Sequence, residues 1–348
     1  MARALELART PGVPLGPNPR VGCVLLDGDG VTVAEGYHRG AGTPHAEVDA
    51  LLQAGGRARG TTAVVTLEPC NHTGRTGPCS EALVAAGVAR VVYAQSDPNP
   101  LAAGGADFLR RAGVGVDGGL LVDEAREVNR VWTFAVEHGR PFVTWKFATT
   151  LDGRSAAADG TSRWVSSRAA RLDTHRLRGL ADVVLAGTGT VLVDDPELTV
   201  RDVDNRPLAR QPLRAVMGLR EVPADRRVLN DVAETVVFPT RDPATVLQEL
   251  YKRDRQHVFL EGGPTLAAAF LRAGLVDEVV AYVAPMLLGS GTSAVADLGI
   301  GTVADALRFD VVDISVVGEG NDANARFTLR PVTSERTEQT APTPSKER

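Results

Sequence analysis

Short apolar segments alternate with helix-like stretches along almost the whole chain, and this alternation limits the fold more than any other feature. Apolar segments of roughly four to eight residues, bounded by turn residues, are typical of strands. Strands that alternate with helices predict an α/β architecture, in which helices cover a sheet. In the first part of the chain we expect strands at 21–26, 63–67 and 88–94, and helices at 46–54, 80–86, 106–112 and 122–136.

The segment His138-Gly139-Arg140-Pro141 divides the chain. Gly followed shortly by Pro ends a helix and indicates a boundary, and 348 residues suit two domains. We expect one domain over 1–139, a second over 140–330, and a disordered tail, rich in Thr, Ser, Pro, Glu and Lys, over 331–348. In the second domain we expect strands at 141–147, 182–186, 214–217, 235–238, 257–260 and 278–284, and helices at 169–177, 243–251 and 265–273.

Charge, hydropathy and cysteine content exclude several classes of protein. The net charge of -5 and the 5% aromatic residues predict no nucleic-acid partner, which would need a basic surface. No run of about 18 apolar residues is present, and the N-terminus lacks a signal-peptide pattern, so we expect no membrane partner. Three cysteines argue against a disulfide framework and favour the cytoplasm. Cys23 falls in a predicted strand and is interpreted as a core residue.

His45, Cys70 and Cys79 have the pattern of a catalytic zinc site. One histidine and two cysteines supply three ligands and leave the fourth tetrahedral position for water. Glu47, two residues after His45, is placed to move protons without being a ligand, as in the H-x-E…P-C-x-x-C pattern of zinc nucleobase deaminases. Two alternatives stay open: two ordinary buried cysteines, or a structural zinc site that Glu47 or His72 completes.

The loop between the two cysteines is longer than in that pattern. Eight residues separate Cys70 from Cys79, rather than two. The loop carries His72 and Arg75, whose side chains suit a polar or anionic substrate. The sequence therefore predicts substrate contacts from this loop.

Two glycine-containing loops follow predicted strands in the second half. They are Gly187-Thr188-Gly189-Thr190 and Glu261-Gly262-Gly263-Pro264-Thr265. Glycines between a strand and a helix bring backbone N–H groups close to an anion such as a diphosphate. Neither loop has the G-x-G-x-x-G pattern of a Rossmann fold, and for the first loop a plain tight turn is the alternative.

Several longer motifs are distributed over residues 1–330. In the first half they include Asn18-Pro19-Arg20-Val21-Gly22, Gly36-Tyr37-His38 and the segment from Thr66 to Cys79. In the second half they include Thr174-His175-Arg176-Leu177-Arg178 and Ala284-Pro285-Met286-Leu287-Leu288-Gly289. In this order, they resemble the bifunctional riboflavin-biosynthesis deaminase/reductase. The resemblance implies a cytidine-deaminase-like α/β/α sandwich followed by a dihydrofolate-reductase-like α/β domain.

For the first half, the resemblance implies one zinc ion per chain, bound by His45, Cys70 and Cys79, with Glu47 as proton shuttle. It implies substrate contacts from Asn18, His38, His72 and Arg75. Asp49 stands where the family usually has a second histidine. We interpret it as lying outside the residues that directly contact the zinc ion or the substrate.

For the second half, the resemblance implies NADPH as hydride donor, with Lys146 and Asp194 as catalytic residues. Met217-Gly218 departs from the family's usual Leu-Asp. Ser166 and Arg168 are candidates for reading the 2′-phosphate, with a helix cap and its first turn as the alternative. A solvated helix face and a surface ion pair are the alternative for Arg178 and Arg201. The expected substrate contacts are Ser162, Arg178, Arg201 and Glu261, and the expected cofactor contacts are Thr161, Trp164, Ser166, Gly187, Gly189, Thr190, Gly262, Gly263 and Thr265.

The implied activity is riboflavin biosynthesis in two steps. The first is deamination of 2,5-diamino-6-(5-phosphoribosylamino)pyrimidin-4(3H)-one, and the second is reduction of the ribosyl group of 5-amino-6-(5-phosphoribosylamino)uracil to ribityl. The resemblance also suggests a homo-oligomer formed through the reductase halves. A nucleic-acid deaminase, a zinc-stabilised scaffold that only senses NADPH, and an enzyme with one decayed half are the competing hypotheses.

Overall fold

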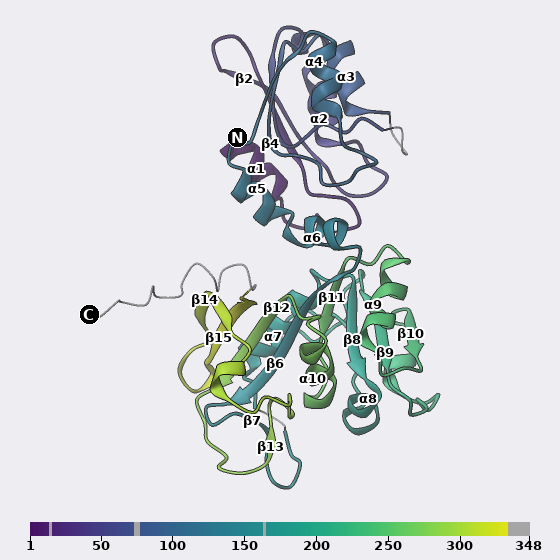
Figure 1. Cartoon of the computed structure of the whole chain (residues 1–348), viewed down its shortest axis with the longest axis vertical. Coiled ribbons are helices and arrows are strands. Elements are labelled where there is room, and N and C mark those ends of the chain that lie inside the picture. The colour runs from purple at the N-terminus through teal and green to yellow at the C-terminus, as the bar shows by residue number, and fades with distance from the viewer. Residues whose placement is uncertain (14–15, 73–76, 163–164, 333–348) are drawn as a thin grey trace, which may run out of the picture. The chain divides into compact units, whose positions relative to one another are not determined.

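The structure, a computed structural model, describes residues 1–13, 16–72, 77–162 and 165–332. It divides the chain into two compact units (Figure 1). The first comprises Met1–Pro141 and Asp254–Gln256, and the second comprises Phe142–Arg253 and His257–Arg348. No helix in the described ranges has both the length and the apolar character needed to cross a membrane.

The first unit is built on a five-stranded sheet in the order β2-β1-β3-β4-β5. Strand β1 (Gly22–Leu26) pairs antiparallel with β2 (Thr32–Tyr37) and with β3 (Thr62–Leu67). Strands β3, β4 (Arg90–Gln95) and β5 (Gly115–Gly118) are parallel. The loop that carries Cys70 follows directly after the carboxyl end of β3.

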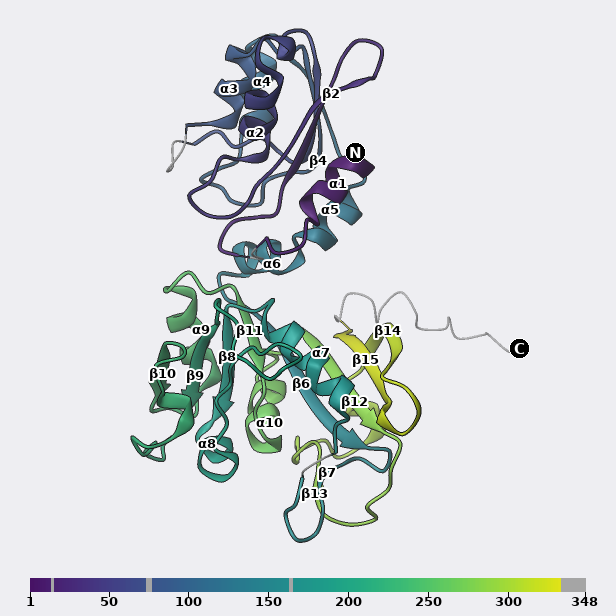
Figure 2. The ribbon, with the colours of Figure 1, turned by 180° about the vertical axis from the view of Figure 1, so that it is seen from behind.

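Helices cover both faces of this sheet (Figures 1 and 2). Helices α2 (Ala46–Ala54), α3 (Cys79–Ala85) and α4 (Gly105–Arg111) lie on one face, and α1 (Ala2–Ala8) and α5 (Val122–Val128) lie on the other. Helix α2 packs so closely on β2 that a Cβ atom on Gly36 would lie 2.4 Å from the Ala46 carbonyl oxygen. This close approach fixes the beginning of α2, which carries His45 and Glu47.

The single helix expected at 122–136 is wrong, because the structure has two helices there. Helix α5 ends at Val128, and α6 (Arg130–His138) begins after Asn129. The Asn129 side chain accepts a hydrogen bond from the Arg20 backbone N–H at 2.7 Å and donates one to the Arg20 carbonyl at 2.9 Å. These two bonds hold Asn129 at φ -106°, ψ 18°, outside helical geometry.

The second unit contains an eight-stranded sheet in the order β10-β9-β8-β11-β6-β12-β15-β14. The first six strands are parallel, and β15 pairs antiparallel with both β12 and β14. Two short strands, β7 (Arg154–Ala156) and β13 (Thr292–Ser293), form a separate pair. The strands of the large sheet are β6 (Phe142–Thr150), β8 (Val183–Gly187), β9 (Leu213–Met217), β10 (Thr235–Phe238), β11 (His257–Leu260), β12 (Glu278–Ala284), β14 (Phe309–Val317) and β15 (Asn324–Pro331).

Four α-helices accompany this sheet: α7 (Arg168–Arg178), α8 (Thr188–Asp194), α9 (Pro243–Tyr251) and α10 (Pro264–Arg272). The core includes Val183, Leu185, Val258 and Leu260 from the central strands, all fully buried. The carboxyl ends of β8, β9, β10 and β11 meet at one edge, where ligands bind in open α/β sheets. The described chain also has short 3-10 helices at Gly55–Ala58, Arg227–Leu229, Val303–Asp305 and Gly320–Asp322.

Candidate active sites

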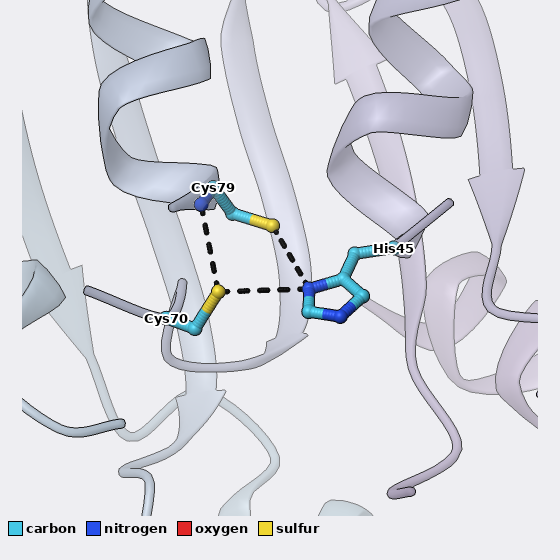
Figure 3. Close-up of side chains that lie close together, drawn as sticks. All are labelled: His45, Cys70 and Cys79. Atoms are coloured by element: carbon cyan, nitrogen blue, oxygen red, sulfur yellow. Dashed lines mark hydrogen bonds between the residues drawn. The ribbon is translucent and has the colours of Figure 1, made fainter. Parts of the chain in front are cut away.

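His45, Cys70 and Cys79 come together in the first unit (Figure 3). Their ligand atoms all lie within 4.8 Å of one another. His45 Nδ1 is 3.2 Å from Cys79 Sγ and 3.5 Å from Cys70 Sγ. Zinc–ligand bonds of about 2.0–2.3 Å place the ligands of a tetrahedral ion at separations of this order. The donor atoms and their spacing therefore fit a zinc ion.

Local structure explains why these three side chains converge. His45 is the N-cap of α2, and Cys79 is the first residue of α3. Cys70 follows β3, and its sulfur faces the Cys79 backbone N–H at 3.5 Å. Hydrogen bonding to Cys79, together with the nearby His45 imidazole, lowers the pKa of the Cys70 thiol to about 4 despite its burial. The same contact, and then burial, raise the pKa of the Cys79 thiol, so without a metal the pair favours one thiolate, on Cys70.

Glu47 is a buried carboxyl group beside this cluster. It lies in the first turn of α2 and is only 4% exposed. Burial, and then the nearby Cys70 thiolate, raise the pKa of Glu47 to about 7. A carboxyl group with a pKa near neutrality can both accept and release a proton during catalysis.

His38 and Asn18 form a hydrogen-bonded pair next to the cluster. His38 Nδ1 lies 2.9 Å from the Pro44 carbonyl oxygen and therefore carries the ring proton. Nε2 is then free to accept a hydrogen bond from the Asn18 amide at 3.0 Å. Burial lowers the pKa of His38, which favours this neutral ring. The His38 and His45 rings meet edge to face at 5.2 Å between centroids.

A cavity of about 410 Å³ opens onto these residues. The His72 Nδ1 atom is buried and has no hydrogen-bond partner among the described residues, so it is available to a ligand. Arg75 lies outside the described residues. The sequence-predicted residues that line the cavity are Asn18, His38, His45, Glu47, Cys70 and His72.

Asp97 and Asn99, which were not among the expected site residues, also line this cavity. Burial raises the pKa of the Asp97 carboxyl to about 6. Glu68 holds this wall in place, because its carboxylate accepts hydrogen bonds from the backbone N–H groups of Asp97 and Ala106. The functional signal in the sequence was the polar Asp97-Pro98-Asn99 turn after a strand.

Asp49 lies outside the cavity. Its carboxylate forms an ion pair with Arg39 at 2.9 Å and accepts a hydrogen bond from the Tyr37 backbone N–H at 3.1 Å. Both partners flank His38 in the chain. The residue that departs from the family pattern thus supports the segment around His38 and makes no contact with the three zinc-site side chains in the described structure.

In the second unit, Lys146 lies midway along β6, and Glu261 directly follows the neighbouring parallel strand β11. Trp145 pairs with Leu260, the last residue of β11, so Glu261 comes next to Lys146. Burial lowers the pKa of Lys146, although the charge of Glu261 opposes this effect. The Lys146 Nζ atom also lies 5.6 Å from the centre of the Tyr282 ring.

The two arginines expected to contact the substrate, Arg178 and Arg201, already have acidic partners. Arg178 makes a two-pronged pair with Glu261, with one N–H···O distance of 2.9 Å, and donates to the Thr199 carbonyl at 2.8 Å. Burial would raise the pKa of Glu261, but the charge of Arg178 outweighs it and the pKa is lowered. Arg201 pairs with Glu197.

A larger cavity, of about 810 Å³, lies at the carboxyl ends of the strands in the second unit. Most of the cofactor contacts expected from the two glycine loops line it, together with the catalytic candidate Asp194. The sequence-predicted residues that line it are Gly187, Gly189, Thr190, Asp194, Gly263 and Thr265. Sequence reasoning missed Arg220, Thr240, Arg241 and Arg272, which also line it.

Other sequence-predicted residues do not line this cavity. Thr161 and Ser162 are exposed, and the Thr161 hydroxyl donates to Asp159. Ser166 precedes the helix cap, which is Ser167, and the Arg168 backbone N–H donates to Asp322. Trp164 lies outside the described residues.

Comparisons with known proteins agree for both units. Residues 1–95 match the cytidine and deoxycytidylate deaminase zinc-binding region, and residues 141–322 match the RibD C-terminal domain. The riboflavin biosynthesis protein RibD of Mycobacterium tuberculosis (strain CDC 1551 / Oshkosh) is 52% identical over 303 residues, which cover 87% of this chain and 89% of that protein.

Solved structures show the same likeness. RibD of Acinetobacter baumannii, form 1, has a TM-score of 0.86 at 39% identity, covering 95% of this chain and 98% of that one. A diaminohydroxyphosphoribosylaminopyrimidine deaminase/5-amino-6-(5-phosphoribosylamino)uracil reductase of Thermotoga maritima has a TM-score of 0.84 at 33% identity, covering 95% and 97%. A cytidine-deaminase-like unit is thus followed by a dihydrofolate-reductase-like unit. The chain belongs to the RibD family, the bifunctional deaminases and reductases of riboflavin biosynthesis.

Proposed function

We propose that residues 1–139 deaminate 2,5-diamino-6-(5-phosphoribosylamino)pyrimidin-4(3H)-one and that residues 140–330 reduce the ribosyl group of 5-amino-6-(5-phosphoribosylamino)uracil. The chain is a zinc- and NADPH-dependent enzyme of riboflavin biosynthesis. The two activities for which the Thermotoga maritima relative is named support these two substrates. The observation that carries the deaminase assignment is the His45, Cys70 and Cys79 cluster beside a buried Glu47.

In the first unit, the chain's own residues orient the substrate and move protons. A zinc ion held by His45, Cys70 and Cys79 would make hydroxide available from a water molecule at neutral pH. Glu47 takes one proton from the water and delivers it to the ring nitrogen. It then takes the second proton from the added hydroxyl group and passes it to the departing amine, which leaves as ammonia.

The substrate is held by polar side chains around the smaller cavity. The buried, unpartnered His72 Nδ1 supports a direct contact to the substrate, and the His38 ring, whose two nitrogens bond to Asn18 and Pro44, is proposed to contact it from the cavity wall. Asn18 positions His38 and contacts the pyrimidine, and Arg75 binds the phosphoribosyl part. The placement of Asn18, His38 and His72 in the cavity wall supports these contacts.

In the second unit, NADPH supplies the hydride that reduces C1′ of the opened ribose. Lys146 on β6 and Glu261 just after β11 contact the ribose, while Asp194 orients it or relays a proton. Arg178 keeps the Glu261 carboxylate ionised and fixed in direction through its two-pronged pair. Ser162 and Arg201 complete the proposed substrate contacts, with Thr161, Trp164, Ser166, Gly262 and the cavity residues for the cofactor.

Two half-reactions test this proposal. Purified, zinc-loaded protein should release ammonia from the diaminopyrimidine, and it should oxidise NADPH only when the deaminated product is supplied. Ammonia release without NADPH oxidation would indicate a decayed second unit. Activity on single-stranded RNA in place of the small pyrimidine would contradict the substrate assignment.

We also infer a cytoplasmic homo-oligomer formed through the second units. Strand β14 is an edge strand, and the side chains of Val311, Ile314 and Val316 are exposed on one of its faces, because their partners on β15 are every second residue. Such a surface favours pairing with a second copy. All three cysteines are free thiols, which suits a reducing compartment.

A further inference from the structure

Two arginines that the sequence analysis did not single out lie at the second unit's cavity. Arg220 follows strand β9 by three residues, and Arg241 follows β10 by three residues. Both side chains line the cavity together with Thr240, and both residues are exposed. Within the described part of the chain, neither forms an ion pair with an acidic side chain.

The cavity as a whole is cationic. Its charged lining residues are Arg220, Arg241 and Arg272 against the single carboxylate of Asp194. The Arg272 guanidinium is already engaged, because it donates to the Asp297 carbonyl at 2.8 Å. Arg220 and Arg241 therefore supply the positive charge that remains open to an anionic ligand.

Arg220 reaches back over the first glycine loop. A Cβ atom on Gly189 would lie 2.8 Å from the Arg220 Nη2 atom. A guanidinium group thus lies directly against the first turn of α8, which follows the carboxyl end of β8. The Arg220 guanidinium can donate hydrogen bonds to phosphate oxygens that the backbone N–H groups of this segment do not reach.

Strand order gives the direction of a dinucleotide across this cavity. The nicotinamide must lie near Lys146 on β6, where the ribose is reduced. The sheet continues β6-β11-β8-β9-β10, so β9 and β10 lie three and four strand positions away, about 14 and 19 Å at roughly 4.8 Å per strand. The glycine loops after β11 and β8 lie between, where the diphosphate crosses. The adenosine end then falls beside Arg220 and Arg241.

We propose that Arg220 and Arg241, with Thr240, bind the 2′-phosphate of NADPH and make the enzyme prefer NADPH to NADH. The two cofactors differ only in this phosphate, which is close to a dianion at pH 7. The inference rests on the proposed use of this cavity as the cofactor site. It replaces Ser166 and Arg168 as the readers of that phosphate, since neither lines the cavity.

The test measures affinity for each dinucleotide, apart from turnover. Arg220→Gln, Arg241→Gln and the double variant are made in the full chain, with Arg210→Gln, an exposed arginine outside the cavity, as the matched control. Dissociation constants for NADPH and NADH are measured by calorimetry, and 2′,5′-ADP is compared with 5′-AMP as a fragment probe. Thermal unfolding checks that each variant is folded.

We expect each single variant to weaken NADPH binding roughly tenfold or more, because a charge-assisted hydrogen bond is lost, and to leave NADH binding unchanged. The same loss should be seen for 2′,5′-ADP but not for 5′-AMP. Equal weakening of NADPH and NADH, or no change in either, overturns the proposal while leaving the cofactor site intact. Failure of the wild-type protein to bind either dinucleotide overturns the cofactor site itself.

Discussion

The zinc cluster and the cofactor cavity are built from different kinds of groups. The first consists of four side chains between residues 45 and 79, three of which are buried. The second is an open cavity formed by strand ends, glycine loops and long exposed side chains spread from 187 to 292. A site made of a few buried side chains should fail completely when one is changed. A site made largely of backbone should lose function in steps.

The largest effect is expected from Glu47→Gln. Loss of the proton carrier should lower deamination by about 10²- to 10⁴-fold, while zinc content and NADPH oxidation stay at wild-type levels. Asp49→Asn is the matched control, because it changes a second carboxyl group on the same helix that faces Arg39 and Tyr37 instead. Ammonia release and metal analysis give the result. Equal loss in both variants would mean that the helix, rather than the Glu47 carboxyl, had been damaged.

Lys146→Met tests the corresponding position in the second unit. Reduction should fall by about 10²-fold or more, as expected when a polar group that contacts the reacting sugar is lost, whereas ammonia release should not change. The dissociation constant for NADPH should also stay close to that of the wild type. If NADPH binding is lost together with turnover, Lys146 holds the cofactor and the proposed substrate contact is wrong.

Strand β14 tests whether the second units associate. Ile314→Lys combined with Val316→Lys places two charges on exposed apolar positions of the edge strand. We expect the molecular mass from light scattering to fall to that of the monomer, because charges on an edge strand oppose pairing. Val31→Lys, at an exposed apolar position in the first unit, serves as the control. An unchanged mass would place the interface elsewhere.

The smallest effect concerns pH and the Arg178–Glu261 pair. The pKa of Glu261 is lowered in the folded state from its ordinary value of 4.5. The pair therefore stabilises the fold fully above about pH 4.5, and this contribution is lost as the pH falls through the lower folded pKa. The free energy of unfolding should decline on acidification less steeply for Glu261→Gln than for the wild type. Urea titrations between about pH 6 and 3 measure both slopes, and identical slopes would contradict this assignment.

The same contrast explains how much of the molecule could be predicted from its sequence. The strand at 235–238 and the helices at 46–54 and 243–251 were predicted with the observed bounds, because their patterns are local. His45, Cys70 and Cys79 were found because zinc chemistry demands particular residue types at short spacing. The observed cluster confirms that they meet, and their role as ligands stays a proposal.

The misses have a common physical cause. The helix break at Asn129 depends on hydrogen bonds to Arg20, 109 residues earlier. Arg220 and Arg241 become neighbours of the glycine loops only through the order of the strands, which local patterns do not encode. The two-pronged pair of Arg178 with Glu261 joins residues 83 positions apart. Long-range pairings of this kind were beyond reasoning from spacing and residue type.

The different placement of the cysteines allows thiol modification to report both unfolding and loss of the metal. Cys23 is fully buried in β1, and burial raises the pKa of its thiol, so an alkylating reagent meets it only after the first unit unfolds. Cys70 borders the smaller cavity, where reagent can enter once a chelator has stripped the metal. The number of alkylated cysteines, measured by mass spectrometry, therefore distinguishes molecules that have lost the metal from molecules that have unfolded in a single preparation.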